Sequence, residues 1–137
     1  MSTVGRLYEV FAKYPTPRIQ DADPTDCTAG DGTAERIELA LRAKPLAELS
    51  DGDLLDFYYL AITHCGTIDA FKHYLPRILE LMATIRRPLI SVRLLESRLR
   101  DARFNTWPQD ERNIVLTFCR EAAPDSRLHK VAQELSA

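Results

Sequence analysis

The chain has 137 residues, a net charge of −2 and 45% hydrophobic residues, which are values typical of one small globular domain. No run of residues approaches the roughly 20 apolar positions that a membrane-spanning helix needs, so we expect no such helix. We predict a single domain over residues 1–137 that buries a core without disulfides or a metal.

The cysteines indicate the compartment in which the chain works. Cys27, Cys65 and Cys119 are odd in number and far apart, which is not the pattern of a disulfide framework. Arg6 and Glu9 interrupt the early apolar stretch, so it does not resemble a signal peptide. We therefore expect a cytosolic protein.

Charge is divided unevenly along the chain. Residues 1–70 carry 12 acidic and 6 basic side chains, whereas residues 71–137 carry 8 acidic and 12 basic ones. One interpretation is an ordinary solvated surface whose two halves attract each other, and the other is a face that meets a polar partner. The basic half holds too many acids to argue strongly for nucleic acid.

Two predicted helices open the chain. Apolar residues recur every three or four positions over residues 3–14 and 33–43, the spacing of amphipathic helices. Pro15 and Pro45 end them, because proline cannot donate a backbone hydrogen bond. The residues expected to face the core are Val4, Leu7, Tyr8, Phe11, Ile37, Ala40 and Leu41.

A long acidic loop is predicted between these helices, at about residues 15–32. A structureless segment of this length in a compact domain is either functional or disordered, and both interpretations stay open. Its acidic residues are Asp21, Asp23, Asp26 and Asp31.

A third helix is predicted from Ser50 to about His64. Ser50 and Asp53 have the spacing of a capping box, in which each side chain satisfies the other residue's backbone N–H. Asp51 and Asp53 also lie in the first turn, where the helix dipole favours negative charge. Three consecutive aromatic residues over 57–59 span about 200° of this helix, so either the helix is central or one of them, such as Tyr59, faces a partner.

The fourth helix is predicted to begin after Thr67 and to continue to Ile85. Its apolar stripe keeps one phase across Pro76. We favour a kinked helix at this proline over two separate helices.

Three more helices are predicted over about 91–103, from Trp107-Pro108 to 123, and from Asp125 or Ser126 onward. The outer face of the first of these three is expected to be basic. Its arginines are Arg93, Arg98, Arg100 and Arg103. No segment alternates with the period of a strand. We therefore predict an all-α fold of about seven helices, packed as antiparallel hairpins in a bundle or short helical stack.

Catalytic and metal-binding motifs are not favoured. His64 and Cys65 are adjacent on a helix and point about 100° apart, so they cannot form a nucleophile–base pair. A metal site at Cys27 with His64 or His73 is conceivable, but the spacing typical of zinc ligands is missing. We expect no cofactor, no metal and no enzymatic activity.

Several strings resemble a family of uncharacterised bacterial all-helical proteins. The most specific string runs from Gly66 to Met82 and contains FKHYLPRILEL; others are Val10–Pro17, Pro45–Leu54 and Trp107-Pro108. The resemblance implies a helical fold and brings no established activity. The family's loop after the first helix often carries two closely spaced cysteines, where this chain has Cys27 alone.

The leading hypothesis is a cytosolic protein-binding domain, most concretely an immunity protein that neutralises a bacterial toxin by direct binding. This role is an analogy of size and composition. Many toxin domains act on nucleic acid and are basic, so an acidic surface would attract them quickly. The candidate partner-binding residues are Asp21, Asp23, Asp26, Asp31, Asp51, Asp53, Asp56 and Tyr59.

Two alternatives stay open. One is a small enzyme with a cleft near His64, His73 and Cys27. The other is a nucleic-acid-binding regulator that uses a basic helix face. The residues of that face would be Arg86, Arg87, Arg93, Arg98, Arg100 and Arg103.

Overall fold

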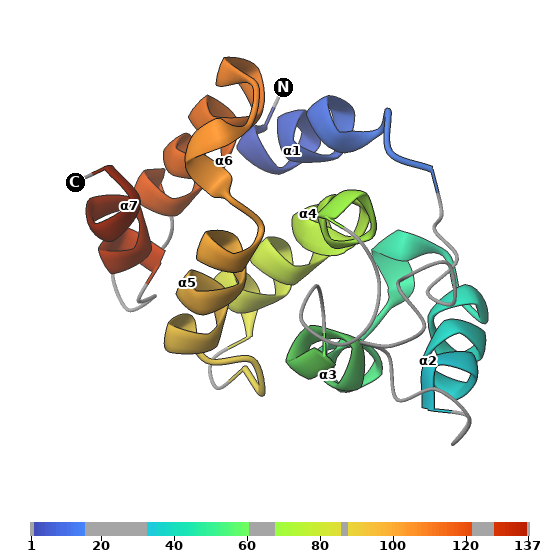
Figure 1. Cartoon of the computed structure of the whole chain (residues 1–137). Coiled ribbons are helices and arrows are strands. Elements are labelled where there is room, and N and C mark those ends of the chain that lie inside the picture. The colour runs from blue at the N-terminus through green and yellow to red at the C-terminus, as the bar shows by residue number, and fades with distance from the viewer. Residues whose placement is uncertain (1, 16–32, 61–67, 86–87, 122–127, 137) are drawn as a thin grey trace.

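The computed structural model describes residues 2–15, 33–60, 68–85, 88–121 and 128–136. Within these residues there are seven α-helices, two short 3₁₀ helices and no strand, which confirms the predicted all-α class (Figure 1). The elements are α1 (Thr3–Phe11), α2 (Thr33–Arg42), η2 (Leu46–Glu48), α3 (Asp51–Leu60), α4 (Ile68–Thr84), α5 (Val92–Asp101), η3 (Phe104–Thr106), α6 (Gln109–Glu121) and α7 (Leu128–Ser136).

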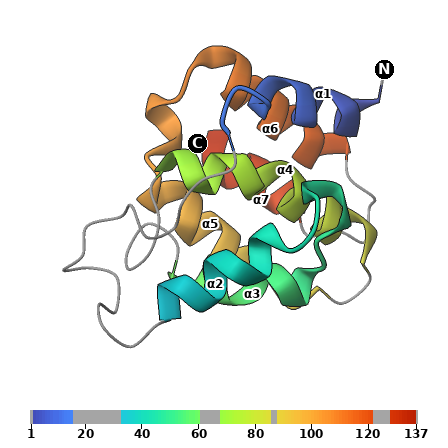
Figure 2. The same ribbon diagram turned by 90° about the vertical axis from the view of Figure 1, so that its right-hand side faces the viewer.

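The helices are arranged in layers around α4. Figure 2 shows α1 and α6 above α4, with α2 and α3 below it, and Figure 1 shows the same order. α1 packs on both α4 and α6, while α2 packs on α3. α7 packs on α6 and α5, which brings the last helix beside the fifth.

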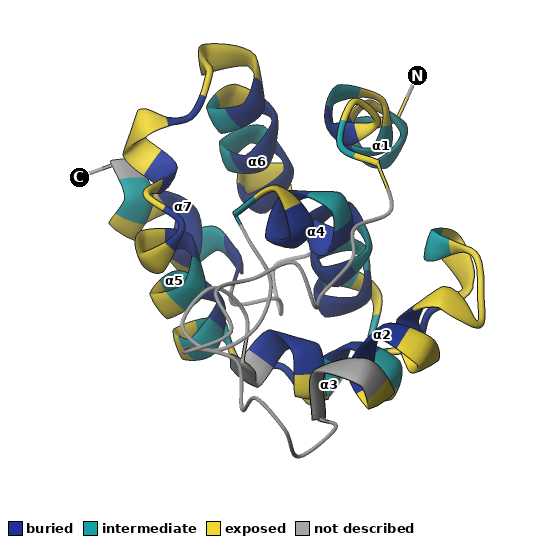
Figure 3. Cartoon of the chain, turned by 45° about the vertical axis from the view of Figure 1, so that its right-hand side comes forward, coloured by how far each residue is buried: buried dark blue, intermediate teal, exposed yellow. Residues whose placement is uncertain are grey.

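Helix α4 is the centre of the molecule. Ten of its 17 residues are buried, so it has no broad solvated face (Figure 3). α3, which one interpretation of the sequence made the central helix, buries Leu54, Phe57 and Tyr58 but leaves Gly52 and Asp56 exposed. α4 also continues through Pro76 as one helix, which excludes two separate helices at this point.

Most of the predicted apolar stripes face the core. Leu7, Phe11 and Leu41 are at most 2% exposed, because each lies where its helix meets a neighbour. The prediction for Ala40 is wrong: it lies on the exposed side of α2, next to Leu39, which is 72% exposed. A helix packed on one neighbour buries only a narrow stripe, and α2 contacts mainly α3.

Several predictions concern residues outside the described ranges. They concern the acidic loop at 16–32, with its four aspartates and Cys27, and the end of the third predicted helix, with His64 and Cys65. They also concern Arg86, Arg87 and the predicted cap at Asp125 or Ser126. Among the helices that are described, none combines the length and the apolar character needed to cross a bilayer.

Candidate binding surfaces

The acidic start of α3 is a capping structure. Ser50 N–H donates to Asp53 Oδ2 at 2.9 Å, and Asp53 N–H donates to Ser50 Oγ at 3.0 Å, which confirms the predicted capping box. Lys44 Nζ adds an ion pair to the same Asp53 oxygen at 2.9 Å. The Ser50 amide first, and then the Lys44 ammonium, hold the pKa of the Asp53 carboxyl below its usual value.

The other predicted acidic residues differ in their surroundings. Asp51 Oδ2 accepts a hydrogen bond from Leu89 N–H at 2.9 Å and so ties the start of α3 to the segment before α5. Asp56 is exposed and makes no hydrogen bond or ion pair with the rest of the described chain. The side chain of Tyr59 is not described. Asp51 and Asp53 therefore have structural partners within the chain, whereas Asp56 is free to meet another molecule.

The predicted basic face of α5 is smaller than expected. Arg98 is not part of it, because its Nε donates to the backbone oxygen of Tyr58 at 2.8 Å and its Nη1 pairs with Asp101 at 2.9 Å. Tyr58 lies on α3, so this hydrogen bond joins α5 to α3. Arg93, Arg100 and Arg103 are exposed as predicted.

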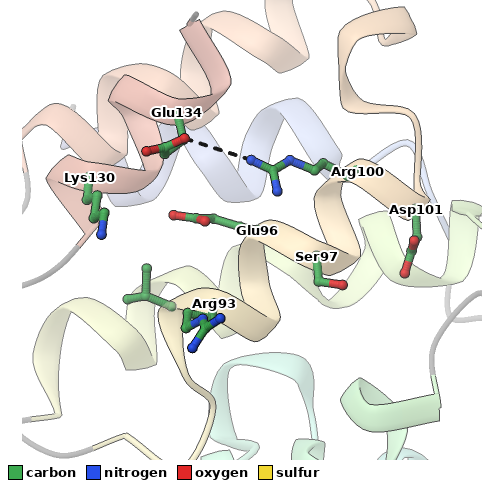
Figure 4. Close-up of a pocket in the computed structure, with 8 residues that line it drawn as sticks. Arg93, Glu96, Ser97, Arg100, Asp101, Lys130 and Glu134 are labelled. Carbon is green, nitrogen blue, oxygen red and sulfur yellow. Dashed lines mark ion pairs between the residues drawn. The ribbon is translucent and has the colours of Figure 1, made fainter.

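A charged groove lies between α5 and α7 (Figure 4). Its volume is about 560 Å³, and we call it the α5/α7 groove. The residues that line it are Val92, Arg93, Glu96, Ser97, Arg100, Asp101, Lys130 and Glu134. Three lining side chains are basic and three are acidic, so the groove has no net charge.

Few charges in the α5/α7 groove neutralise each other. Arg100 and Glu134 approach to 3.9 Å across the groove, with 61% and 45% of their side chains exposed, and such an open pair contributes little. Arg93, Glu96 and Lys130 form no ion pair within the described ranges. Figure 4 shows the Glu96 carboxylate extending from α5 toward α7. The groove therefore offers charges of both signs to another molecule.

A buried ionic cluster joins α1, α4 and α6. Glu111, at the start of α6, is 0% exposed, and Lys72 on α4 is 6% exposed. Lys72 Nζ lies 2.8 Å from Glu111 Oε1 and donates to Tyr14 Oη at 3.0 Å. Tyr14 Oη and Lys13 Nζ both donate toward Glu111 Oε2. The Trp107 ring covers the Lys72 ammonium, with its centroid 4.6 Å away.

The charge on Glu111 is maintained by these contacts. Burial on its own raises the pKa of the Glu111 carboxyl, but the donors on Lys13, Lys72 and Tyr14 outweigh burial and lower it. For Tyr14, burial and the bond to Glu111 both raise the pKa of the phenol. Because the charges of Glu111 and Lys72 are buried and neutralise each other, we interpret the cluster as a structural link between helices.

No metal or nucleophile site is found in the described part of the chain. No three His, Cys, Asp or Glu side chains converge there as metal ligands. Cys119 is buried, and burial raises the pKa of its thiol to about 12, so it stays protonated and unreactive. His73 Nδ1 lies 2.8 Å from the Tyr14 carbonyl oxygen, which accepts a hydrogen bond from it, so this histidine has a structural partner.

Comparisons with known proteins found no similar protein. No family model, no curated protein and no solved structure matches this chain. The family resemblance of the Gly66–Met82 string therefore stays a prediction.

Proposed function

We propose that this chain is a protein-binding domain and that the α5/α7 groove is its docking face. One observation carries the proposal: the groove holds charges of both signs, and Arg93, Glu96 and Lys130 have no ion pair in the described chain. Charged groups arranged in this way select a partner with the complementary arrangement and speed the encounter. Exposed charges of this kind contribute little to the stability of the fold, so a role in recognition fits them better.

The mixture of charges favours a protein over other ligands. A phosphate backbone would be repelled by Glu96, Asp101 and Glu134, which stand among the basic residues of the groove. Small-molecule sites are usually lined by apolar and aromatic side chains, and Val92 alone is apolar here. A protein surface can supply acidic and basic groups together.

The most concrete form of the proposal is a cytosolic immunity protein that binds a basic toxin domain. The acidic first half of the chain supports this form, with a charge of −6 over residues 1–70. That charge attracts a basic domain from a distance, whereas the direct contacts are made at the α5/α7 groove. The odd number of widely spaced cysteines supports a reducing compartment.

Co-expression tests the proposed function. The tagged chain would be produced with the product of each neighbouring reading frame, and the purified material weighed by native mass spectrometry. We expect a one-to-one complex with one neighbour, and the immunity form predicts that this neighbour is toxic when expressed alone. Absence of a complex with every neighbour would contradict the proposal in this form.

A nucleic-acid-binding regulator is the second candidate, because Arg93, Arg100 and Arg103 are exposed on or beside α5. It requires retention on DNA or RNA that falls steeply with salt. We expect no retention even at about 50 mM salt, where such binding is strong. Retention that Arg93→Ala weakens would favour this candidate over a protein partner.

A further inference from the structure

The charges of the α5/α7 groove form a regular series. Along α5, Arg93, Glu96 and Arg100 are spaced by three and four residues, so they lie along one face of the helix. Lys130 and Glu134, on α7, form the opposite wall and are also four residues apart. These three residues present base, acid and base at intervals of one helical turn, and Asp101, the remaining charged lining residue of α5, is already paired with Arg98.

A second copy of this chain that pairs through its own α5 does not complement that series. In an antiparallel pairing of two α5 helices about the groove centre, Arg93 of one copy would face Arg100 of the other. Like charges in contact are unfavourable, and a symmetric interface repeats each such contact twice. A symmetric dimer formed through α5 would therefore place arginines opposite each other instead of opposite acids.

Resting on the proposed function, we infer that the α5/α7 groove receives a helix of a different protein whose ridge carries acid, base and acid at one-turn intervals. Its outer carboxylates would face Arg93 and Arg100, and its central Lys or Arg would face Glu96. Ser97 is the smallest residue of the lining and leaves room for the ridge beside Glu96. The open Arg100–Glu134 contact can exchange for the incoming carboxylate, because it contributes little.

Two synthetic helical peptides test this inference on the full chain. One alanine-rich peptide carries Glu, Lys and Glu at positions i, i+4 and i+7, and its control carries Lys, Glu and Lys at the same positions. Binding would be followed by amide chemical shifts of the isotope-labelled chain. The chain has a net charge of −2, so non-specific attraction favours the control peptide, which is net positive. Tighter binding of the first peptide, which is net negative, would therefore report specific contacts in the groove.

We expect the first peptide to bind about tenfold more tightly than the control near 50 mM salt, a preference that shrinks as salt rises. The shifted amides should belong to α5 and α7. The triple variant Arg93→Glu, Glu96→Lys, Arg100→Glu should reverse the preference. Glu9→Lys, at an exposed position of α1, should leave it unchanged.

Equal affinity for both peptides, or shifts confined to other helices, would overturn the inference. Equal affinity with shifts on α5 and α7 would overturn the acid–base–acid pattern alone and leave the groove as a docking face. The proposed function fails separately, when co-expression yields no complex.

Discussion

Glu111 carries a negative charge in a place that water does not reach. Transfer of a carboxylate from water is expensive, and the charge persists because Lys72, Lys13 and Tyr14 all direct donors at it. The same contacts connect three helices that are far apart in the chain. These side chains therefore determine how the end of α1 is held against α4 and α6.

Removal of the charge on Glu111 should weaken the fold. Glu111→Gln leaves the Lys72 ammonium buried without its counter-ion, and breaking such a pair costs about 3–5 kcal/mol. The free energy of unfolding, measured by urea titration, should fall by about that amount. The double variant Lys72→Met, Glu111→Leu is the control, because it removes both charges and should recover most of the loss. Unchanged stability of Glu111→Gln would contradict the account of the cluster.

The cluster should also make stability depend on pH. The folded chain holds the pKa of Glu111 below the value of 4.5 of the free carboxyl. The stabilisation from this group is therefore fully present above pH 4.5 and is lost as the pH falls through the lower folded pKa. The difference in unfolding free energy between the wild type and Glu111→Gln should shrink in this acidic range. A difference that stays constant down to pH 3 would exclude Glu111 as the source.

The sequence contains one signal for this cluster. Glu111 lies three, four and seven residues before the buried Ile114, Val115 and Phe118, so it belongs to their stripe. Its position in the first turn of a helix suggests a solvated acid favoured by the dipole, which is why it was missed. A charged residue in register with an apolar stripe indicates a buried pair, but the sequence does not identify its partner.

At the scale of the element, α3 begins where its capping box predicted. The Ser50 and Asp53 side chains satisfy each other's backbone N–H groups, so the helix start is determined locally. Local signals of this kind can be read from sequence, since all the participating atoms lie within four residues. The same is true of the N-cap at Ser91, whose Oγ accepts from Leu94 N–H at 3.1 Å.

Loss of the cap should destabilise α3 and leave partner binding intact. Ser50→Ala should lower the free energy of unfolding by about 1 kcal/mol, the usual cost of losing an N-cap. Asp53→Ala should cost a similar amount, and the double variant should cost less than the sum, because both changes break one reciprocal motif. Chemical denaturation measures all three. Full additivity would show that the two residues act separately.

Other features of the elements could not be predicted from periodicity. Arg98 was placed on a basic outer face, but its long side chain reaches the backbone oxygen of Tyr58 on α3, 40 residues away along the chain. Whether an arginine extends into solvent or donates to a distant carbonyl oxygen depends on tertiary packing. The central role of α4 was missed for the same reason. When apolar residues surround a helix, the sequence does not indicate on which sides other helices pack.

For the whole molecule, the sequence predicted the all-α class and approximate helix positions but not the site. The α5/α7 groove combines residues from 92–101 with Lys130 and Glu134, and its existence depends on α7 packing beside α5. Sequence periodicity indicates which face of a helix is apolar, but it does not indicate which other helix packs against that face. The acidic surface proposed from the sequence retains Asp56 alone as a free described aspartate, so the groove is the better supported docking face.

Hydrogen–deuterium exchange of the free chain and of its complex with the co-purified neighbour tests the docking face most directly. Exchange slows where binding suppresses local opening, so it maps the interface onto the helices. The account predicts increased protection of backbone amides on α5 and α7, with α2 and α3 unchanged. Protection confined to α2 and α3, with exchange in α5 and α7 as fast as in the free chain, would contradict it.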